Sequence, residues 1–272
     1  MAVGTSRDRG RPRGERLNDG LSVLTVGEGP PLVVLPGLGA GADLSGGVPH
    51  SMLRSYLALA RRFGRTVHLI HRPVDPPPGL TIASLAGWHA SAFRARFGEP
   101  VDVLGVSGGG ITGLQLALDH PETVRRLALS VAASRVGEQA LRDLSLMMEQ
   151  EAHGRSSAGI GSRLNADGPL RLLLLIYGLS RGQARAPGEV ALVTAAQTWD
   201  VTGRLGELSQ PVLLVGGGRD RIMPPDLVRA TAAGIPDARL VMLPRRGHLS
   251  ALFDPRRTAA TEAFLAEPVP VK

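Results

Sequence analysis

Residues 101–118 read VDVLGVSGGGITGLQLAL, and this stretch decides how the rest of the chain folds. The apolar-rich residues 101–104 predict a short strand, and the helical spacing of the apolar residues in 108–118 predicts a helix. Between them lies Ser107, with one glycine two positions before it and another two positions after it. This G-x-S-x-G spacing is typical of a sharp strand-to-helix turn that lifts a serine hydroxyl above one edge of a sheet.

The flanking glycines, Gly105 and Gly109, have a steric purpose in this prediction. A side chain at either position would bring the strand and the helix into collision, so both positions need to be almost free of side-chain atoms. The helix that follows directs its unpaired N–H groups toward the serine, where they favour developing negative charge. Ser107 is therefore the candidate nucleophile, and the alternative hypothesis is an ordinary glycine turn without chemistry.

A second G-x-S-x-G occurs at 178–182, around Ser180, and it also follows an apolar run. The residues after this second motif read QARAPG, which cannot carry a helix far because proline interrupts it. After Gly109, in contrast, no proline occurs until Pro121. The context favours Ser107 as the functional serine, and Ser180 is interpreted as coincidence.

The length of 272 residues fits one large α/β domain, and a hydrophobic content of 43% is enough for a sizeable core. The chain contains no cysteine, which excludes disulfides, a thiol nucleophile and a cysteine metal site. The net charge is +7, and Lys272 is the only lysine, so the positive charge comes from arginine. Because these arginines are scattered and aromatic residues make up only 3%, the composition argues against a nucleic-acid partner.

Residues 1–18 are predicted to form a disordered basic leader, because five of the first sixteen residues are arginine among glycine and proline. The segment has no apolar h-region, so it does not resemble a secretory signal. No apolar run reaches membrane-spanning length, which argues against a membrane partner. The expected location is the cytoplasm.

Strands and helices alternate on both sides of the central stretch, and this order predicts a mostly parallel sheet with helices on both faces. The expected core comprises 19–133 and 199–272, and the irregular segment 134–198 is expected to form a small helical cap. Strands are expected at 21–26, 31–35, 67–70, 101–104, 124–131, 211–216 and 239–243; core helices at 52–62, 81–97, 108–118, 225–234 and 255–265; and cap helices at 138–152, 170–177 and 189–198.

From about residue 20 to 266 the chain resembles the α/β-hydrolase fold family. The resemblance depends on four motifs in the right order: 35–39 (LPGLG), 105–109 (GVSGG), 216–224 (GGGRDRIMP) and 246–248 (RGH). The family places its triad in the chain order serine, acid, histidine. The resemblance therefore implies a catalytic triad of Ser107, Asp220 and His248, with no cofactor and no metal ion.

The residue chemistry fits these roles. Serine needs a base to remove its proton, and His248 lies just past a strand end on a loop opened by Gly247. The acid that orients such a histidine is expected at Asp220, which follows the strand 211–216. Asp226 is the fallback acid, although an aspartate in a first helical turn explains it better. The other histidines considered as bases are His89, His120 and His153, which are placed less well, and His50 and His71, which could line the pocket.

The oxyanion hole is expected to combine the backbone N–H of Gly108 with a second N–H from the loop after strand 31–35. The resemblance assigns that second donor to Leu38, with Gly39 as the alternative. Many relatives carry histidine before the glycine of this loop, whereas this chain has Pro36. Because the expected donor is a backbone N–H, the oxyanion hole does not depend on a histidine at position 36.

Residues 37–42 (GLGAGA) also fit the dinucleotide fingerprint G-x-G-x-x-G/A. The fingerprint requires a helix to begin at once, and the sequence after residue 42 favours a longer loop. It also prefers an acid at the end of the next strand, where this chain has His71 and Arg72. Because an arginine there suits a 2′-phosphate, a nicotinamide enzyme stays open as an alternative.

The predicted function is a serine hydrolase that cleaves a carboxylic ester, thioester or lactone of a small, largely apolar substrate through an acyl-enzyme. One alternative is another chemistry of the same fold, namely lactone opening, carbon–carbon cleavage, cyclisation or cofactor-free haloperoxidation. A second alternative is a small-molecule binding protein with negligible turnover. Apolar residues of the cap are expected to join the core or line the pocket: Met147, Met148, Leu164, Leu170, Leu172 to Leu175 and Leu179.

Overall fold

A single eight-stranded sheet organises the part of the chain that the computed structural model describes, residues 13–38, 43–46, 48–165 and 187–268. The strand order is β1-β2-β4-β3-β5-β6-β7-β8; β1 and β2 are antiparallel to their neighbours, and the strands from β4 to β8 run parallel. The predicted α/β class with a mostly parallel sheet is confirmed. The strands are β1 (Arg13–Arg16), β2 (Ser22–Val26), β3 (Pro31–Leu35), β4 (Thr66–His71), β5 (Val101–Val106), β6 (Val124–Ser130), β7 (Val212–Gly217) and β8 (Ala238–Leu243).

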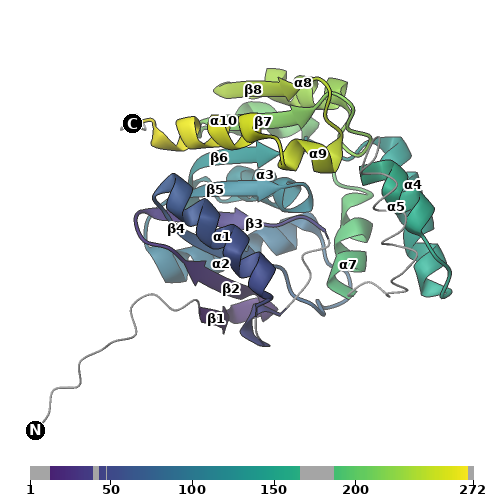
Figure 1. Cartoon of the computed structure of the whole chain (residues 1–272), viewed down its shortest axis with the longest axis horizontal. Coiled ribbons are helices and arrows are strands. Elements are labelled where there is room, and N and C mark those ends of the chain that lie inside the picture. The colour runs from purple at the N-terminus through teal and green to yellow at the C-terminus, as the bar shows by residue number, and fades with distance from the viewer. Residues whose placement is uncertain (1–12, 39–42, 47, 166–186, 269–272) are drawn as a thin grey trace, which may run out of the picture.

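Helices cover both faces of this sheet (Figure 1). On one face lie α1 (His50–Phe63) and α10 (Pro255–Ala266), which pack on a core cluster that includes Leu69 and Phe264. On the other face lie α2 (Ile82–Phe97), α3 (Gly108–Asp119) and α8 (Pro225–Gly234), which share the larger core cluster. A parallel sheet buried on both faces needs strands that are apolar on both sides, and β3, β5 and β7 have this composition.

Helices α4 (Glu138–Ala152), α5 (Ala158–Asn165) and α7 (Pro187–Ala196) gather beyond one end of the sheet (Figure 1). The predicted helices at 138–152 and 189–198 correspond to α4 and α7, whereas the predicted helix at 170–177 lies outside the described residues. Helix α5 was not predicted, because its sequence AGIGSRLN contains two glycines. Burial of Ile160 and Leu164 offsets this weak helix propensity.

Strand β1 corrects one prediction at the N-terminus. Residues 13–16, expected within the disordered leader, pair antiparallel with β2 from Arg13↔Thr25 to Arg16↔Ser22. A charged sequence can form an edge strand because backbone hydrogen bonds stabilise it, and charged side chains at an edge also hinder pairing with other chains. Hydrophobic patterning does not detect such a strand.

Candidate active site

Ser107 stands at the junction of β5 and α3 with φ 50° and ψ −117°, a conformation that a residue other than glycine rarely adopts. The predicted need for the two glycines is visible in atomic distances. A β-carbon on Gly105 would lie 2.7 Å from the Cα of Gly110, and one on Gly109 would lie 2.1 Å from the carbonyl oxygen of Leu35. Side chains at these two positions would push α3 away from the sheet.

His248 bridges Ser107 and Asp220. Its Nε2 lies 2.9 Å from Ser107 Oγ, and its Nδ1 lies 2.8 Å from Asp220 Oδ2. With the proton on Nδ1, the ring donates to the carboxylate and accepts from the serine hydroxyl. His248 is 3% exposed and Asp220 is 4% exposed, so little water competes for these bonds. The structure brings together the three side chains that the sequence analysis selected from distant segments.

The sequence around Asp220 explains why its carboxylate faces the histidine. Its other oxygen, Oδ1, accepts hydrogen bonds from the backbone N–H groups of Ile222 and Met223 at 2.8 and 2.9 Å. Glycines before Asp220 allow the two loops to touch, because a β-carbon on Gly217 would lie 2.5 Å from the carbonyl oxygen of Arg246. The backbone N–H of Arg219 donates to that same oxygen at 2.9 Å.

His248 is the first residue of the five-residue helix α9 (His248–Leu252), where a loop was expected.

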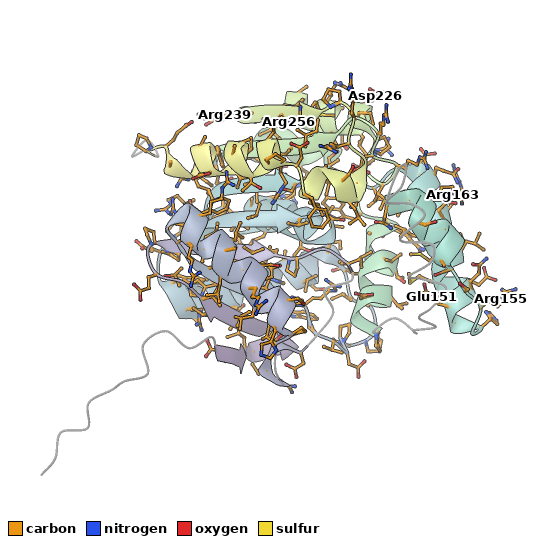
Figure 2. All side chains as sticks on the ribbon, viewed as in Figure 1. Glu151, Arg155, Arg163, Asp226, Arg239 and Arg256 are labelled. Atoms are coloured by element: carbon orange, nitrogen blue, oxygen red, sulfur yellow. The ribbon has the colours of Figure 1, made fainter. Side chains whose placement is uncertain are left out.

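The alternative acid, Asp226, lies in the first turn of α8 with its side chain 99% exposed (Figure 2). Its carboxylate pairs with Arg229 at 3.5 Å and takes no part in the constellation around Ser107. The preference for Asp220 over Asp226 therefore agrees with the geometry.

Four of the other histidines take no part in the hydrogen-bonded chain around Ser107 in the described part of the structure. His89 is buried with its Nδ1 2.8 Å from the carbonyl oxygen of Leu85, and His153 makes the same kind of contact with Glu149. His50 is exposed at the start of α1. His71 is buried, and neither of its ring nitrogens has a hydrogen-bond partner among the described residues. Burial lowers the pKa of His71 to about 4, so this ring is neutral at physiological pH.

The loop after β3 lies beside the serine. A β-carbon on Gly37 would be 3.2 Å from the Cβ of Ser107, and one on Gly108 would be 4.0 Å from the backbone nitrogen of Leu38. The backbone nitrogen of Leu38 therefore lies close to Gly108, the residue next to the serine. Gly39, the alternative second donor, lies outside the described residues.

A cavity of about 10 Å³ adjoins Gly108. Leu192 of α7 lines the cavity and lies against Gly108; a β-carbon on Gly108 would lie 2.9 Å from the Leu192 Cδ2. Leu192 was missed as a candidate, because one leucine in a helix carries no sequence signal for a site. The lining is Leu35, Pro36, Ile70, Arg72, Leu85, His89, Gly108, Gly109, Thr112 and Leu192.

The predicted apolar residues of the cap have a different outcome. Met147 and Leu164 belong to the main core cluster, and Met148 packs against it. The leucines predicted at 170–179 and the second G-x-S-x-G around Ser180 lie outside the described residues. The dinucleotide fingerprint at 37–42 lies partly outside them, and the first α-helix after β3 begins only at His50.

Residues 32–261 match the model of the alpha/beta hydrolase family. The chain belongs to the alpha/beta hydrolase family. It is similar to the pimeloyl-acyl carrier protein methyl ester esterase of Nitrosomonas europaea, with 27% identity over 250 residues that cover 87% of this chain and 96% of the relative. The family resemblance drawn from the four motifs is thereby confirmed.

Two solved structures show the same fold. A hydrolase from Pseudomonas aeruginosa PA01 has a TM-score of 0.71 at 22% identity, over 96% of this chain and 100% of that chain. The enol-lactonase from Burkholderia xenovorans LB400 has a TM-score of 0.66 at 21% identity, over 93% and 100% of the two chains. At such identities the likeness concerns the fold alone.

The family assignment and the esterase relatives make this chain an esterase-like enzyme of the alpha/beta hydrolase family, as the sequence predicted.

The helices and the arginines of the described residues also bear on the sequence analysis. Each helix in the described residues is too short or too polar to cross a membrane. The labelled arginines are dispersed, with Arg155 and Arg163 near α4 and α5 and Arg239 and Arg256 near β8 and α10 (Figure 2).

Proposed function

We propose that Ser107, His248 and Asp220 form the catalytic triad of a hydrolase that cleaves a carboxylic ester, thioester or lactone through an acyl-enzyme. The observation that carries this proposal is the continuous hydrogen-bonded chain from Ser107 Oγ through both ring nitrogens of His248 to Asp220 Oδ2, with links of 2.9 and 2.8 Å. A nucleophile, a base and an orienting acid in this arrangement are what acyl transfer to water requires.

In the first step His248 Nε2 accepts the hydroxyl proton while Ser107 Oγ attacks the carbonyl carbon. The carbonyl oxygen becomes an oxyanion, which the backbone N–H groups of Leu38 and Gly108 stabilise. The imidazolium then returns its proton to the leaving alcohol, thiol or ring oxygen. Water attacks the acyl-serine with His248 again as the base, the imidazolium then returns this proton to Ser107 Oγ as the bond between Oγ and the acyl carbon breaks, and the carboxylic acid leaves. Asp220 holds the ring in the required tautomer throughout.

A small and apolar acyl group suits the space beside Gly108. Five apolar side chains line the cavity of about 10 Å³, together with two glycines and the polar residues Arg72, His89 and Thr112, and a cavity of this size holds no more than about one water-sized group. We propose that 134–198 acts as the cap of this site, because Leu192 of α7 lines the cavity and lies against Gly108. The similar protein from Nitrosomonas europaea is named as a methyl ester esterase, which is consistent with this substrate class.

The test is a panel of p-nitrophenyl esters of increasing acyl length, with wild-type protein, Ser107→Ala and Ser180→Ala. We expect hydrolysis to be fastest for the shorter esters and to vanish in Ser107→Ala. The matched control Ser180→Ala, taken from the second G-x-S-x-G, is expected to keep wild-type activity. A fluorophosphonate is expected to label Ser107 alone, as shown by peptide mass spectrometry.

The outcomes separate the alternatives. Loss of labelling in Ser180→Ala but not in Ser107→Ala would overturn the assignment of the nucleophile. No labelling and no turnover, together with tight binding of small molecules, would support the non-catalytic binding protein. A change of cofactor fluorescence on titration would support the nicotinamide enzyme. The cytoplasmic location stays a prediction, which cell fractionation tests.

A further inference from the structure

Arg72 is a buried cation beside the loop of the proposed oxyanion hole. Its side chain is 6% exposed, and it lies one position beyond β4. Strands β3 and β4 pair Val34 with Leu69 in parallel. Gly37 lies three residues after Val34, and Arg72 lies three residues after Leu69. The two residues therefore lie side by side just beyond the ends of β3 and β4. The register of the sheet thus places this guanidinium next to the loop after β3.

Arg72 donates a hydrogen bond from Nη1 to the carbonyl oxygen of Gly37 at 3.1 Å. That oxygen belongs to the same peptide unit as the N–H of Leu38. The described peptide bonds are all trans, and in a trans peptide the carbonyl C=O and the N–H lie in the same plane and point in opposite directions. Fixing the oxygen on one side therefore fixes the direction of the Leu38 N–H on the other.

We propose that Arg72 is a positioning residue that orients the Leu38 N–H toward the oxyanion, with Glu189 of α7 as its counter-charge. The inference rests on the proposed function, since it assumes that Leu38 serves the oxyanion. Arg72 does not touch the reacting atoms in this proposal. It acts through one peptide plane of the loop.

Glu189 supplies the partner that a buried arginine needs. Its Oε1 lies 3.5 Å from Arg72 Nη2, and its side chain is 8% exposed. Burial lowers the pKa of Arg72 and the negative charge of Glu189 opposes that shift. A buried ion pair that loses one partner leaves an uncompensated charge, which disturbs the remaining contacts.

Helix α7 is also hydrogen-bonded to the loop after β4, next to this ion pair. The N–H of Gly188 donates to the carbonyl oxygen of Val74 at 2.7 Å. One turn further along α7, Leu192 lines the cavity at Gly108. The Arg72–Glu189 pair thus connects α7, the Gly37–Leu38 peptide and the cavity next to the serine.

The decisive variant is Arg72→Met, which keeps the length of the side chain and removes its donors. We expect kcat for the best p-nitrophenyl ester to fall about 10- to 100-fold, less than the loss of a whole oxyanion donor, with KM within about threefold. Affinity for a boronic acid, which forms a tetrahedral adduct on the serine, is expected to fall by the same factor as kcat. Arg72→Lys, which retains one donor, is expected to recover part of kcat.

Two further variants separate positioning from general stability. Glu189→Gln keeps the side-chain volume and leaves the Arg72–Gly37 bond possible, so we expect a smaller fall of kcat than in Arg72→Met. Arg65→Met is the matched control, because Arg65 is a partly buried arginine paired with Asp102 at 3.2 Å near the opposite end of the sheet. We expect Arg65→Met to lower Tm and leave kcat unchanged.

The results distinguish this inference from the proposed function. If wild-type protein neither reacts with a fluorophosphonate at Ser107 nor hydrolyses any ester, the proposed function fails. If wild-type protein is active and Arg72→Met keeps its kcat and its boronic acid affinity, the role of Arg72 is overturned. If Arg72→Met does not fold, Arg72→Ala with and without added guanidinium decides: a lowered kcat that guanidinium restores supports the role, and a wild-type kcat without guanidinium overturns it.

Discussion

At the scale of single residues, Asp220 is the acid that holds His248 in place. Its Oδ2 faces the ring at 2.8 Å, and its Oδ1 is held by two backbone N–H groups. In Asp220→Asn we expect kcat to fall about a thousand- to ten-thousand-fold, because an amide no longer selects the tautomer with a proton on Nδ1. Steady-state ester hydrolysis measures this. Asp226→Asn is the control, and equal losses in both variants would contradict the assignment.

His71 couples folding to acidity, because its ring is buried and neutral in the folded chain. Burial holds the pKa of its ring at about 4 in the folded chain, against about 6.5 in an unfolded chain. Above pH 6.5 the ring is neutral in both states, so its contribution to stability is fully present. As the pH falls from 6.5 toward 4 the unfolded chain binds the proton first, and up to roughly 3 kcal/mol of folding free energy is lost.

We therefore expect His71→Leu to make the urea midpoint less sensitive to pH between 6.5 and 4. At pH 7 we expect the variant to be as stable as wild type or about 1 kcal/mol more stable, because an apolar side chain replaces a buried group without hydrogen-bond partners. Urea titrations at several pH values measure both effects. Identical pH slopes for the two proteins would refute this account.

At the scale of secondary-structure elements, the approach of α3 to the sheet depends on Gly109. A β-carbon there would lie 2.1 Å from the Leu35 carbonyl oxygen, so we expect Gly109→Ala to cost about 3 kcal/mol or more of stability and to abolish ester hydrolysis. The matched control is Gly159→Ala in α5, where a β-carbon would meet nothing within 4 Å. There we expect a gain of about 0.5–1 kcal/mol. Urea denaturation checks the opposite signs, and a loss in both variants would contradict the steric argument.

At the scale of the whole molecule, Asp102 connects the sheet to the C-terminal helix. Its buried carboxylate accepts hydrogen bonds from Arg125 and Arg126 at 2.7–3.0 Å and pairs with Arg65. Arg126 also donates to the carbonyl oxygens of Phe264, Leu265 and Glu267, which end α10. One carboxylate thus orients the guanidinium groups that cap this helix.

We expect Asp102→Asn to lose about 3–5 kcal/mol of stability, because buried guanidinium groups lose their counter-charge. Asp102 is the second residue of β5, whereas Ser107 follows its last residue, so kcat at low temperature is expected to remain that of wild type. The urea midpoint and the rate of ester hydrolysis measure the two effects separately. A fall in kcat without a fall in stability would contradict this division of the sheet into a structural and a functional end.

Much of the fold was predictable because it depends on local pattern. The strand and helix periods, the stops at glycine and proline, and the steric demands around Ser107 are all properties of neighbouring residues. The edge strand β1 and the helix α5 were missed because backbone pairing and burial stabilise them against their local sequence. The triad residues were selected by family resemblance and by the types of residue that acyl transfer needs, and the distances agree with that selection.

The α/β architecture, the elbow at Ser107 and the candidates Asp220 and His248 followed from the amino-acid sequence, because alternating strands and helices and short motifs are properties of consecutive residues. Which side chain reaches which atom depended on the folded chain. The hydrogen bond of Arg72 to the Gly37 carbonyl, its ion pair with Glu189 and the position of Leu192 in the cavity lining join segments more than thirty residues apart. Such contacts depend on the register of the sheet and on how α7 packs, and no local pattern encodes either.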